Sequence, residues 1–323
     1  MSNRLASDTK MGNRRAGLRR RRIVAALLFA VVAGVSFAGG AAVVAASQAS
    51  NTATIDDATT LNVNCPSPSL SGRLPALVSL PVGYGSTAPA YPVIYFLHGL
   101  PAGPSAYQAN TFVAAELAAG GRRAIVVQPQ GARSDNSDRE YLNWDTGENW
   151  PQAIAHDLVT CIDKRFRTIP NRDGRALIGL SAGGYGAFNI GLRNLDTFGA
   201  VESWSGYFAA TNPAGTQVLN LGSAQANSSA TVPSGTNVTR WLKRWPTLLA
   251  FYVGAQDTRF LTMNQQYDAA LTKSGAAHTF HVYPGGHSGT LWHTQAPAWL
   301  WMALDALTHE ARTRAVSGGA SAG

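Results

Sequence analysis

The sequence predicts an α/β protein in which helices cover both faces of a doubly wound, mostly parallel sheet. Two observations, together with a general rule about such patterns, lead to this prediction. Short apolar runs of strand length recur along the chain from about residue 76. Segments with apolar residues at helical spacing separate most of these runs. Strands that alternate with helices form parallel sheets, and ligands bind such sheets at the carboxyl ends of the strands.

The first half of the chain carries three predicted strands. Ala76–Val82 alternates as a half-buried strand does. Pro92–Leu97 and Ala124–Val127 are apolar runs, which are typical of strands covered on both faces. Helical spacing predicts helices at Thr111–Ala119 and Trp150–Phe166.

The second half repeats this alternation. Strands are predicted at Arg175–Leu180, Val201–Ser205, Thr247–Val253 and Thr279–Tyr283. Helices are predicted at Ala182–Arg193, at Leu261–Thr272 and after Leu291. Two polar stretches, residues 131–149 and 208–240, interrupt the alternation. They are either strand-end loops that rim a pocket or ordinary surface insertions.

The folded part is expected to be one domain over residues 65–312. With 323 residues, 45% hydrophobic and 14% charged, the chain is long enough for a sizeable core and has a globular composition. A linker rich in Ser, Thr, Ala and Asp is predicted at 47–64. A flexible tail is predicted at 313–323.

The first 46 residues are predicted to be an export signal or an N-terminal membrane anchor. A basic head precedes Ile23–Ala46, a run without charged residues. The run is long for a signal and long enough to span a bilayer, so cleavage and membrane association through residues 23–46 both remain open. In either case residues after about 50 face outward, and the protein is expected to be secreted or anchored to the outer side of the cell membrane.

The formal net charge of +8 does not indicate a nucleic-acid partner. The first 22 residues contain eight Lys and Arg residues and one acid, so they supply +7 of this charge. The rest of the chain is nearly neutral, and the basic balance belongs to one terminal segment.

Cys65 and Cys161 are the two cysteines of the chain. Outside the cell an even count favours a disulfide, with two unpaired buried thiols as the alternative. Two lone cysteines without a nearby histidine pair do not make a metal site, and no metal is expected.

Ser181 is the predicted nucleophile. Gly179, Leu180, Ser181, Ala182 and Gly183 fit the pattern G-x-S-x-G between a predicted strand and a predicted helix. A sharp strand-to-helix turn strains the serine and crowds its neighbours, and glycines two positions away leave the necessary room. The turn holds the hydroxyl at the sheet's edge, at the positive end of a helix.

The predicted base is His287. A serine hydroxyl needs a base, and His287 lies in a Pro-Gly-Gly loop just past a strand, which can bend the imidazole back over the sheet. His293 is the second choice, but a helical position directs it away. The predicted acid is Asp257, which follows a strand at its carboxyl end. Its alternative role is to cap the next helix.

Two backbone N–H groups are expected to bind the oxyanion of an acyl-transfer reaction. One belongs to Ala182, directly after the nucleophile. The other is expected from the loop after the strand that ends at Leu97, where Leu100 has an N–H group and Pro101 has none.

The stretches "YPVIYFLHGL", "RALIGLSAGGYGAFNIGLRN" and "VYPGGHSGTLW" resemble the putative esterase family of the α/β-hydrolase fold. That family includes S-formylglutathione hydrolases, feruloyl esterases and the antigen 85 mycolyltransferases. The resemblance covers residues 65–305 and implies an α/β-hydrolase fold. Mycolyltransferases carry Asp and Arg at the positions of His98 and Pro101, and they tend to use Glu where this chain has Asp257. These departures favour hydrolysis.

The sequence therefore predicts an exported serine esterase that cleaves carboxylic esters through an acyl-enzyme and needs no cofactor. Its expected partner is a small-molecule or lipid ester. Acyl transfer to trehalose or a cell-wall glycan is the first alternative, and a catalytically silent binding module is the second. The sequence leaves the oligomeric state open.

Overall fold

The computed structural model describes residues 59–85, 87–131, 141–145, 147–211, 221 and 224–319. The predicted export segment, residues 1–46, lies outside this part of the chain, as do residues 132–140, 146, 212–220 and 222–223 of the two polar stretches. Among the described residues, no helix combines the length and the apolar character needed to cross a bilayer.

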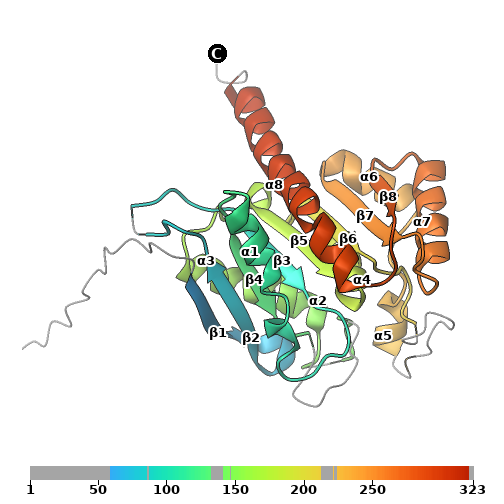
Figure 1. The fold of residues 1–323 in the computed structure, drawn as a ribbon, viewed down its shortest axis with the longest axis horizontal. Helices are drawn as coiled ribbons and strands as arrows, with labels where there is room; N and C mark the ends of the chain where they lie inside the picture. The colour runs from blue at the N-terminus through green and yellow to red at the C-terminus, as the bar shows by residue number, and fades with distance from the viewer. Residues whose placement is uncertain are drawn as a thin grey trace, which may run out of the picture. The chain divides into compact units, whose positions relative to one another are not determined.

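An eight-stranded sheet forms the centre of the described domain, in the order β1-β2-β4-β3-β5-β6-β7-β8 (Figure 1). Its strands are β1 (Thr59–Ser67), β2 (Gly72–Leu80), β3 (Val93–Leu97), β4 (Ile125–Pro129), β5 (Arg175–Leu180), β6 (Ala200–Trp204), β7 (Leu248–Gly254) and β8 (Thr279–Tyr283). β1 and β2 run antiparallel to each other and β2 runs antiparallel to β4. From β4 to β8 all neighbours are parallel. The predicted mostly parallel, doubly wound α/β fold is confirmed.

Helices cover both faces of the sheet (Figure 1). The helices are α1 (Phe112–Ala119), α2 (Trp150–Gln152), the π-helical turn η3 (Ala153–Leu158), α3 (Val159–Arg165), α4 (Ala182–Gly191), α5 (Ala224–Ser229), α6 (Thr236–Arg244), α7 (Leu261–Ser274) and α8 (Gly289–Gly319). Short 3-10 turns lie at Pro68–Leu70, Ala106–Gln108 and Arg172–Gly174. α1 and α8 pack on one face of the sheet, and η3, α3, α4, α6 and α7 pack on the other.

The central strands are buried on both sides, as their apolar runs predicted. Every residue of β3, β4 and β5 is buried. Along β3, Ile94 and Phe96 belong to the core beneath α8, and Tyr95 and Leu97 belong to the opposite core. This alternation follows from the two-residue period of a strand.

Three segments differ from the sequence prediction. The linker predicted at 47–64 is too long, because β1 begins at Thr59. β1 is an edge strand with several exposed polar residues, so its sequence lacks the apolar run of a central strand. The polar stretch 208–240 contains α5 and the start of α6. The tail predicted at 313–323 is also shorter, because α8 continues to Gly319.

The predicted disulfide between Cys65 and Cys161 is present. Cys65 lies in β1 and Cys161 in α3, with the Cα atoms 5.8 Å apart and the sulfur atoms 2.05 Å apart. Cys65 is completely buried. The bridge therefore ties an edge strand to a helix that packs on the sheet.

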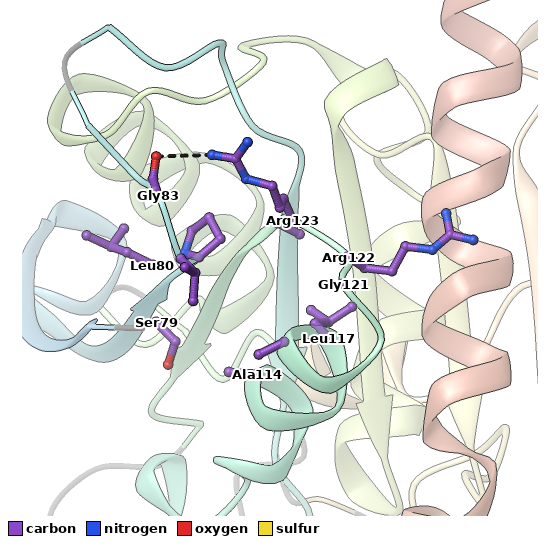
Figure 2. A pocket seen from close by; sticks show the side chains of 12 residues that line it. Ser79, Leu80, Gly83, Ala114, Leu117, Gly121, Arg122 and Arg123 are labelled. Carbon is purple, nitrogen blue, oxygen red and sulfur yellow. Dashed lines mark hydrogen bonds between the residues drawn. The ribbon is translucent and has the colours of Figure 1, made fainter. Parts of the chain in front are cut away.

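A cavity of about 510 Å³ lies between the end of β2 and the end of α1. Figure 2 shows Arg123 above this cavity, where its guanidinium donates a hydrogen bond to the Gly83 carbonyl at 3.0 Å. Ser79 pairs with Val126 near the start of β4, so the cavity lies where the parallel strands begin. Ligand sites of open parallel sheets lie at the other edge, where the strands end.

Candidate active site

The carboxyl ends of three parallel strands bring Ser181, Asp257 and His287 together. Ser181 follows β5, Asp257 follows β7 and His287 follows β8. The Nε2 atom of His287 lies 2.9 Å from Oγ of Ser181. Its Nδ1 atom lies 2.8 Å from Oδ2 of Asp257. The three residues that the sequence nominated thus form one continuous chain of hydrogen bonds.

Ser181 occupies a strained turn between β5 and α4. Its φ of 53° lies in the left-handed region, which residues other than glycine rarely adopt. A Cβ atom on Gly179 would lie 2.1 Å from the carbonyl oxygen of Gly183, and one on Gly183 would lie 2.1 Å from that of Leu97. The two glycines are therefore required by the close approach of the helix to β3 and β5.

Asp257 uses its two carboxylate oxygens for different partners. Oδ2 is bonded to His287, and Oδ1 accepts the backbone N–H groups of Arg259 and Phe260, each at 3.2 Å. The side chain of Asp257 is completely buried. Asp257 therefore adjoins the histidine as the sequence predicted, but it does not cap α7, whose N-cap position is Phe260. Its second oxygen binds the turn that precedes this helix.

The partners of His287 determine which ring nitrogen carries the hydrogen. A carboxylate only accepts hydrogen bonds, so Nδ1 of His287 donates to Asp257. Nε2 is then free to accept the hydroxyl hydrogen of Ser181. The alternative base, His293, packs instead against Phe112, with ring centroids 4.1 Å apart.

The loop after β3 passes directly beside the nucleophile. A Cβ atom on Gly99 would lie 3.0 Å from the Cβ atom of Ser181. Leu100, the predicted oxyanion donor, is the next residue of this loop, and Ala182 is the first residue of α4. The two backbone N–H groups that the sequence nominated therefore belong to segments that flank Ser181.

A buried histidine supports this loop. Nδ1 of His98 lies 2.8 Å from the Gly99 carbonyl oxygen, and the Gly131 N–H donates to Nε2 at 2.9 Å. The Tyr141 hydroxyl donates to the backbone carbonyl of His98 at 2.8 Å. Burial lowers the pKa of His98, so the ring is neutral at pH 7. In the neutral ring, Nδ1 donates to Gly99 and Nε2 accepts from Gly131.

Sequence reasoning missed several residues that contact the candidate site. It treated His98 only as a departure from related sequences, and it did not identify Phe260, Trp292 or Ser205. Phe260 and Trp292 pack against the His287 ring, and Ser205 accepts a hydrogen bond from Trp292. The one available signal was position, because Phe260 follows the acid closely and Trp292 follows the base closely.

No group of three or more His, Cys, Asp or Glu side chains among the described residues has an arrangement that could hold a metal ion.

The chain matches a known family and known proteins. The family model described as "Putative esterase" matches residues 67–300. Esterase Rv1288 from Mycobacterium tuberculosis (strain ATCC 25618 / H37Rv) is 26% identical over 235 residues, which cover 65% of this chain and 51% of that protein. The MPT51 antigen from Mycobacterium leprae (strain TN) is 29% identical over 189 residues, covering 53% of this chain and 60% of that protein. The chain thus spans about half the length of the first of these relatives.

Solved structures share the fold. A ferulic acid esterase has a TM-score of 0.64 at 22% identity and covers 78% of this chain and 99% of its own. S-formylglutathione hydrolase (FrmB) from Staphylococcus aureus has a TM-score of 0.60 at 21% identity and covers 76% of this chain and 99% of its own. Mycobacterium tuberculosis MPT51 (FbpC1) has a TM-score of 0.55 at 22% identity and covers 78% of this chain and 100% of its own.

The sheet order, the helices on both faces and these likenesses show the α/β-hydrolase fold that the sequence predicted. Because the family model covers residues 67–300, well over half of the chain, the chain belongs to the putative esterase family.

Proposed function

We propose that the protein hydrolyses carboxylic esters through an acyl-enzyme formed on Ser181. The observation that carries this proposal is the hydrogen-bonded chain from Ser181 through His287 to Asp257 at the carboxyl edge of the sheet. Ser181 is partly exposed there, whereas the Asp257 carboxylate is buried. This combination leaves the hydroxyl open to a substrate and keeps the carboxylate away from water.

The reaction proceeds in two halves. Oγ of Ser181 attacks the ester carbonyl while Nε2 of His287 takes the hydroxyl proton, and the carbonyl oxygen becomes an oxyanion. As the carbon–oxygen bond to the alcohol breaks, His287 returns this proton to the departing oxygen. Water then attacks the acyl carbon of the acyl-enzyme and gives a proton to His287. His287 passes this proton to Oγ of Ser181 as the acid is released. Asp257 stabilises the imidazolium in both halves.

The oxyanion receives hydrogen bonds from the N–H groups of Leu100 and Ala182. His98 supports the first of these donors indirectly. In a trans peptide the C=O and N–H groups point in opposite directions. The His98 side chain binds the Gly99 carbonyl, so the N–H of Leu100 in the same peptide points away from His98. The Ala182 N–H lies at the start of α4, where the helix dipole also favours negative charge.

Water is favoured over a sugar as the acyl acceptor because His98 has no ring nitrogen to spare. His98 is 3% exposed, its Nδ1–H donates to the Gly99 carbonyl, and its Nε2 accepts the Gly131 N–H. Pro101 has no polar group in its side chain. A site that accepts a polar sugar needs hydrogen-bonding groups beside the acyl-enzyme, and these two positions supply none.

Acyl transfer to trehalose or a glycan remains the second candidate because it uses the same acyl-enzyme. A panel of p-nitrophenyl esters of increasing acyl length, assayed with and without millimolar trehalose, separates the candidates. Hydrolysis predicts free acid as the main product in both conditions. Acyl-trehalose as the main product supports transfer, and no turnover of any ester supports a silent binding module.

We also propose that the protein is exported, because the basic head and the apolar run at residues 1–46 have the pattern of an export signal. Fractionation of the producing cells and N-terminal sequencing of the recovered protein test this point. A chain that begins near residue 50 in the medium indicates cleavage, and a full-length chain in the membrane fraction indicates an anchor. Full-length protein free in the cytoplasm contradicts export.

A further inference from the structure

The imidazole of His287 packs against two aromatic side chains. The Phe260 ring centroid is 5.3 Å from that of His287, with 61° between the ring planes. The Trp292 ring centroid is 5.1 Å away at 86°. These edge-to-face distances are favourable for aromatic pairs. Rotation of the imidazole would break these two ring contacts.

Trp292 is itself held in place by a hydrogen bond. Its indole Nε1–H donates to Oγ of Ser205 at 3.0 Å. Ser205 is completely buried and directly follows the last residue of β6, Trp204. The Trp204 carbonyl accepts the backbone N–H of Ser181 at 2.8 Å. The indole is thus attached to the same strand end that holds the nucleophile's backbone.

Ser205 holds this position at a conformational cost. Its φ of 49° lies in the left-handed region, which is unfavourable for a residue other than glycine. The backbone of Ser205 is held there by its N–H, which donates to the Tyr252 carbonyl at 2.7 Å. Glycine would relieve the strain but would provide no hydroxyl. The hydrogen bond from the Trp292 N–H to the hydroxyl explains why serine, and not glycine, occupies this strained position.

We propose that Trp292, anchored by Ser205, is a positioning residue that keeps the His287 imidazole in place during the lifetime of the acyl-enzyme. This inference rests on the proposed function. In the free enzyme both ring nitrogens of His287 have hydrogen-bond partners. Once Oγ of Ser181 carries an acyl group it has no hydrogen to donate, and Nε2 loses that partner. Asp257, Phe260 and Trp292 then hold the ring until water arrives.

The two halves of the reaction should therefore respond differently when this anchor is removed. Trp292→Phe keeps an aromatic ring but removes the N–H donor, and Ser205→Gly removes the acceptor. With p-nitrophenyl acetate, we expect kcat to fall about tenfold in each variant because deacylation slows. KM falls in parallel, so kcat/KM, which reports acylation, stays within about twofold. Stopped-flow traces should show a burst of p-nitrophenol close to one equivalent per enzyme.

Matched controls separate positioning from a merely structural role. Trp301→Phe changes an exposed tryptophan of the same helix, and Ser71→Gly removes a serine with a φ of 51° from the turn between β1 and β2. Both controls should keep the wild-type kcat. Ser205→Gly should keep or raise Tm while kcat falls, because it relieves strain. The double variant Trp292→Phe/Ser205→Gly should be no slower than either single variant.

The inference is overturned if kcat/KM falls as much as kcat, if both variants keep the wild-type kcat, or if Tm and kcat of Ser205→Gly fall together. These outcomes leave the proposed function standing as long as the wild-type enzyme hydrolyses the ester and Ser181→Ala does not. If the wild-type enzyme shows no turnover that depends on Ser181, the proposed function fails and this inference fails with it.

Discussion

His287 lies 106 residues after Ser181 in the chain, yet its Nε2 atom is 2.9 Å from the serine Oγ. The contact follows from the parallel order of β5, β6, β7 and β8, because the loops that leave such strands emerge at one edge. Each candidate catalytic side chain therefore belongs to a different loop on a shared scaffold. Single substitutions in these loops can change the chemistry while the sheet is retained.

Asp257→Asn should reduce kcat by roughly 10⁴-fold, because an amide N–H facing Nδ1 of His287 forces the hydrogen onto Nε2, which then cannot accept the serine proton. The asparagine side-chain oxygen can still accept the N–H groups of Arg259 and Phe260, so Tm should change little. Steady-state kinetics and a thermal melt test this prediction. Asp305→Asn, on the exposed surface of α8, serves as the control. A loss of less than tenfold in kcat would contradict the assignment of Asp257.

His98→Leu should lower kcat by roughly 10–100-fold with little change in KM, because the Gly99–Leu100 peptide loses the side chain that orients it. His98→Asn should restore part of this activity, since its amide N–H lies close to the place of Nδ1. Comparing kcat and KM for the three proteins tests the idea. Equal kcat values for the Leu and Asn variants, or wild-type kcat in both, would show that His98 does not position the oxyanion loop.

Much of the fold and of the candidate site was predictable from local sequence signals. The buried strands β3, β4 and β5 are short apolar runs, and the G-x-S-x-G pattern marks the turn at Ser181. The acid and the base were narrowed down by their positions just past strand ends. Hydrogen bonds show that Asp257 and His287 adjoin Ser181, while their catalytic roles stay predictions.

The features that sequence reasoning missed depend on contacts between distant segments. β1 has the polar residues of an edge strand, so only its pairing with β2 reveals it. Ser205 and Trp292 are 87 residues apart and meet through the order of β6, β7 and β8. The hydrogen bond between Gly131 and His98 forms because β3 and β4 are neighbours in the sheet. In the sequence, α1 separates these two strands. The composition of a short segment does not indicate which distant segment it contacts.

Stability should fall with rising pH because of Glu202. Burial raises its pKa from an ordinary 4.5 to about 8, and among the described residues its Oε1 has no hydrogen-bond partner. Between these two pKa values the folded protein keeps a proton that the unfolded chain releases. The free energy of unfolding therefore decreases as the pH rises from 4.5, and the decrease stops above about pH 8. The loss between pH 6 and pH 9 should be about 3 kcal/mol.

Glu202→Gln should flatten this dependence, because glutamine does not ionise. Urea unfolding at both pH values measures the effect, and Glu116→Gln on α1 should behave as the wild-type protein does. The prediction is contradicted if the free energy of unfolding changes by the same amount in the wild-type protein and in Glu202→Gln between pH 6 and pH 9. Glu202 would then ionise freely in the fold.

Loss of the disulfide should destabilise the fold without altering the chemistry. Cys65 and Cys161 are 96 residues apart, and closing a loop of this length stabilises a fold by about 4–5 kcal/mol in the chain-entropy model. Neither β1 nor α3 contributes a candidate catalytic residue, so kcat of the folded protein should be retained. Urea unfolding of the Cys65→Ser/Cys161→Ser variant measures the loss. An unchanged urea midpoint would contradict a stabilising role for the bridge.

The central claim is that Ser181 is the nucleophile of an ester hydrolase, and turnover of a p-nitrophenyl ester by purified Ser181→Ala protein tests it most directly. The substitution removes one partly exposed hydroxyl, so the variant should fold with an unchanged circular dichroism spectrum and a similar Tm. The account predicts a fall in kcat of roughly 10³-fold or more, by analogy with the removal of other triad serines. Wild-type turnover in the folded variant would contradict it.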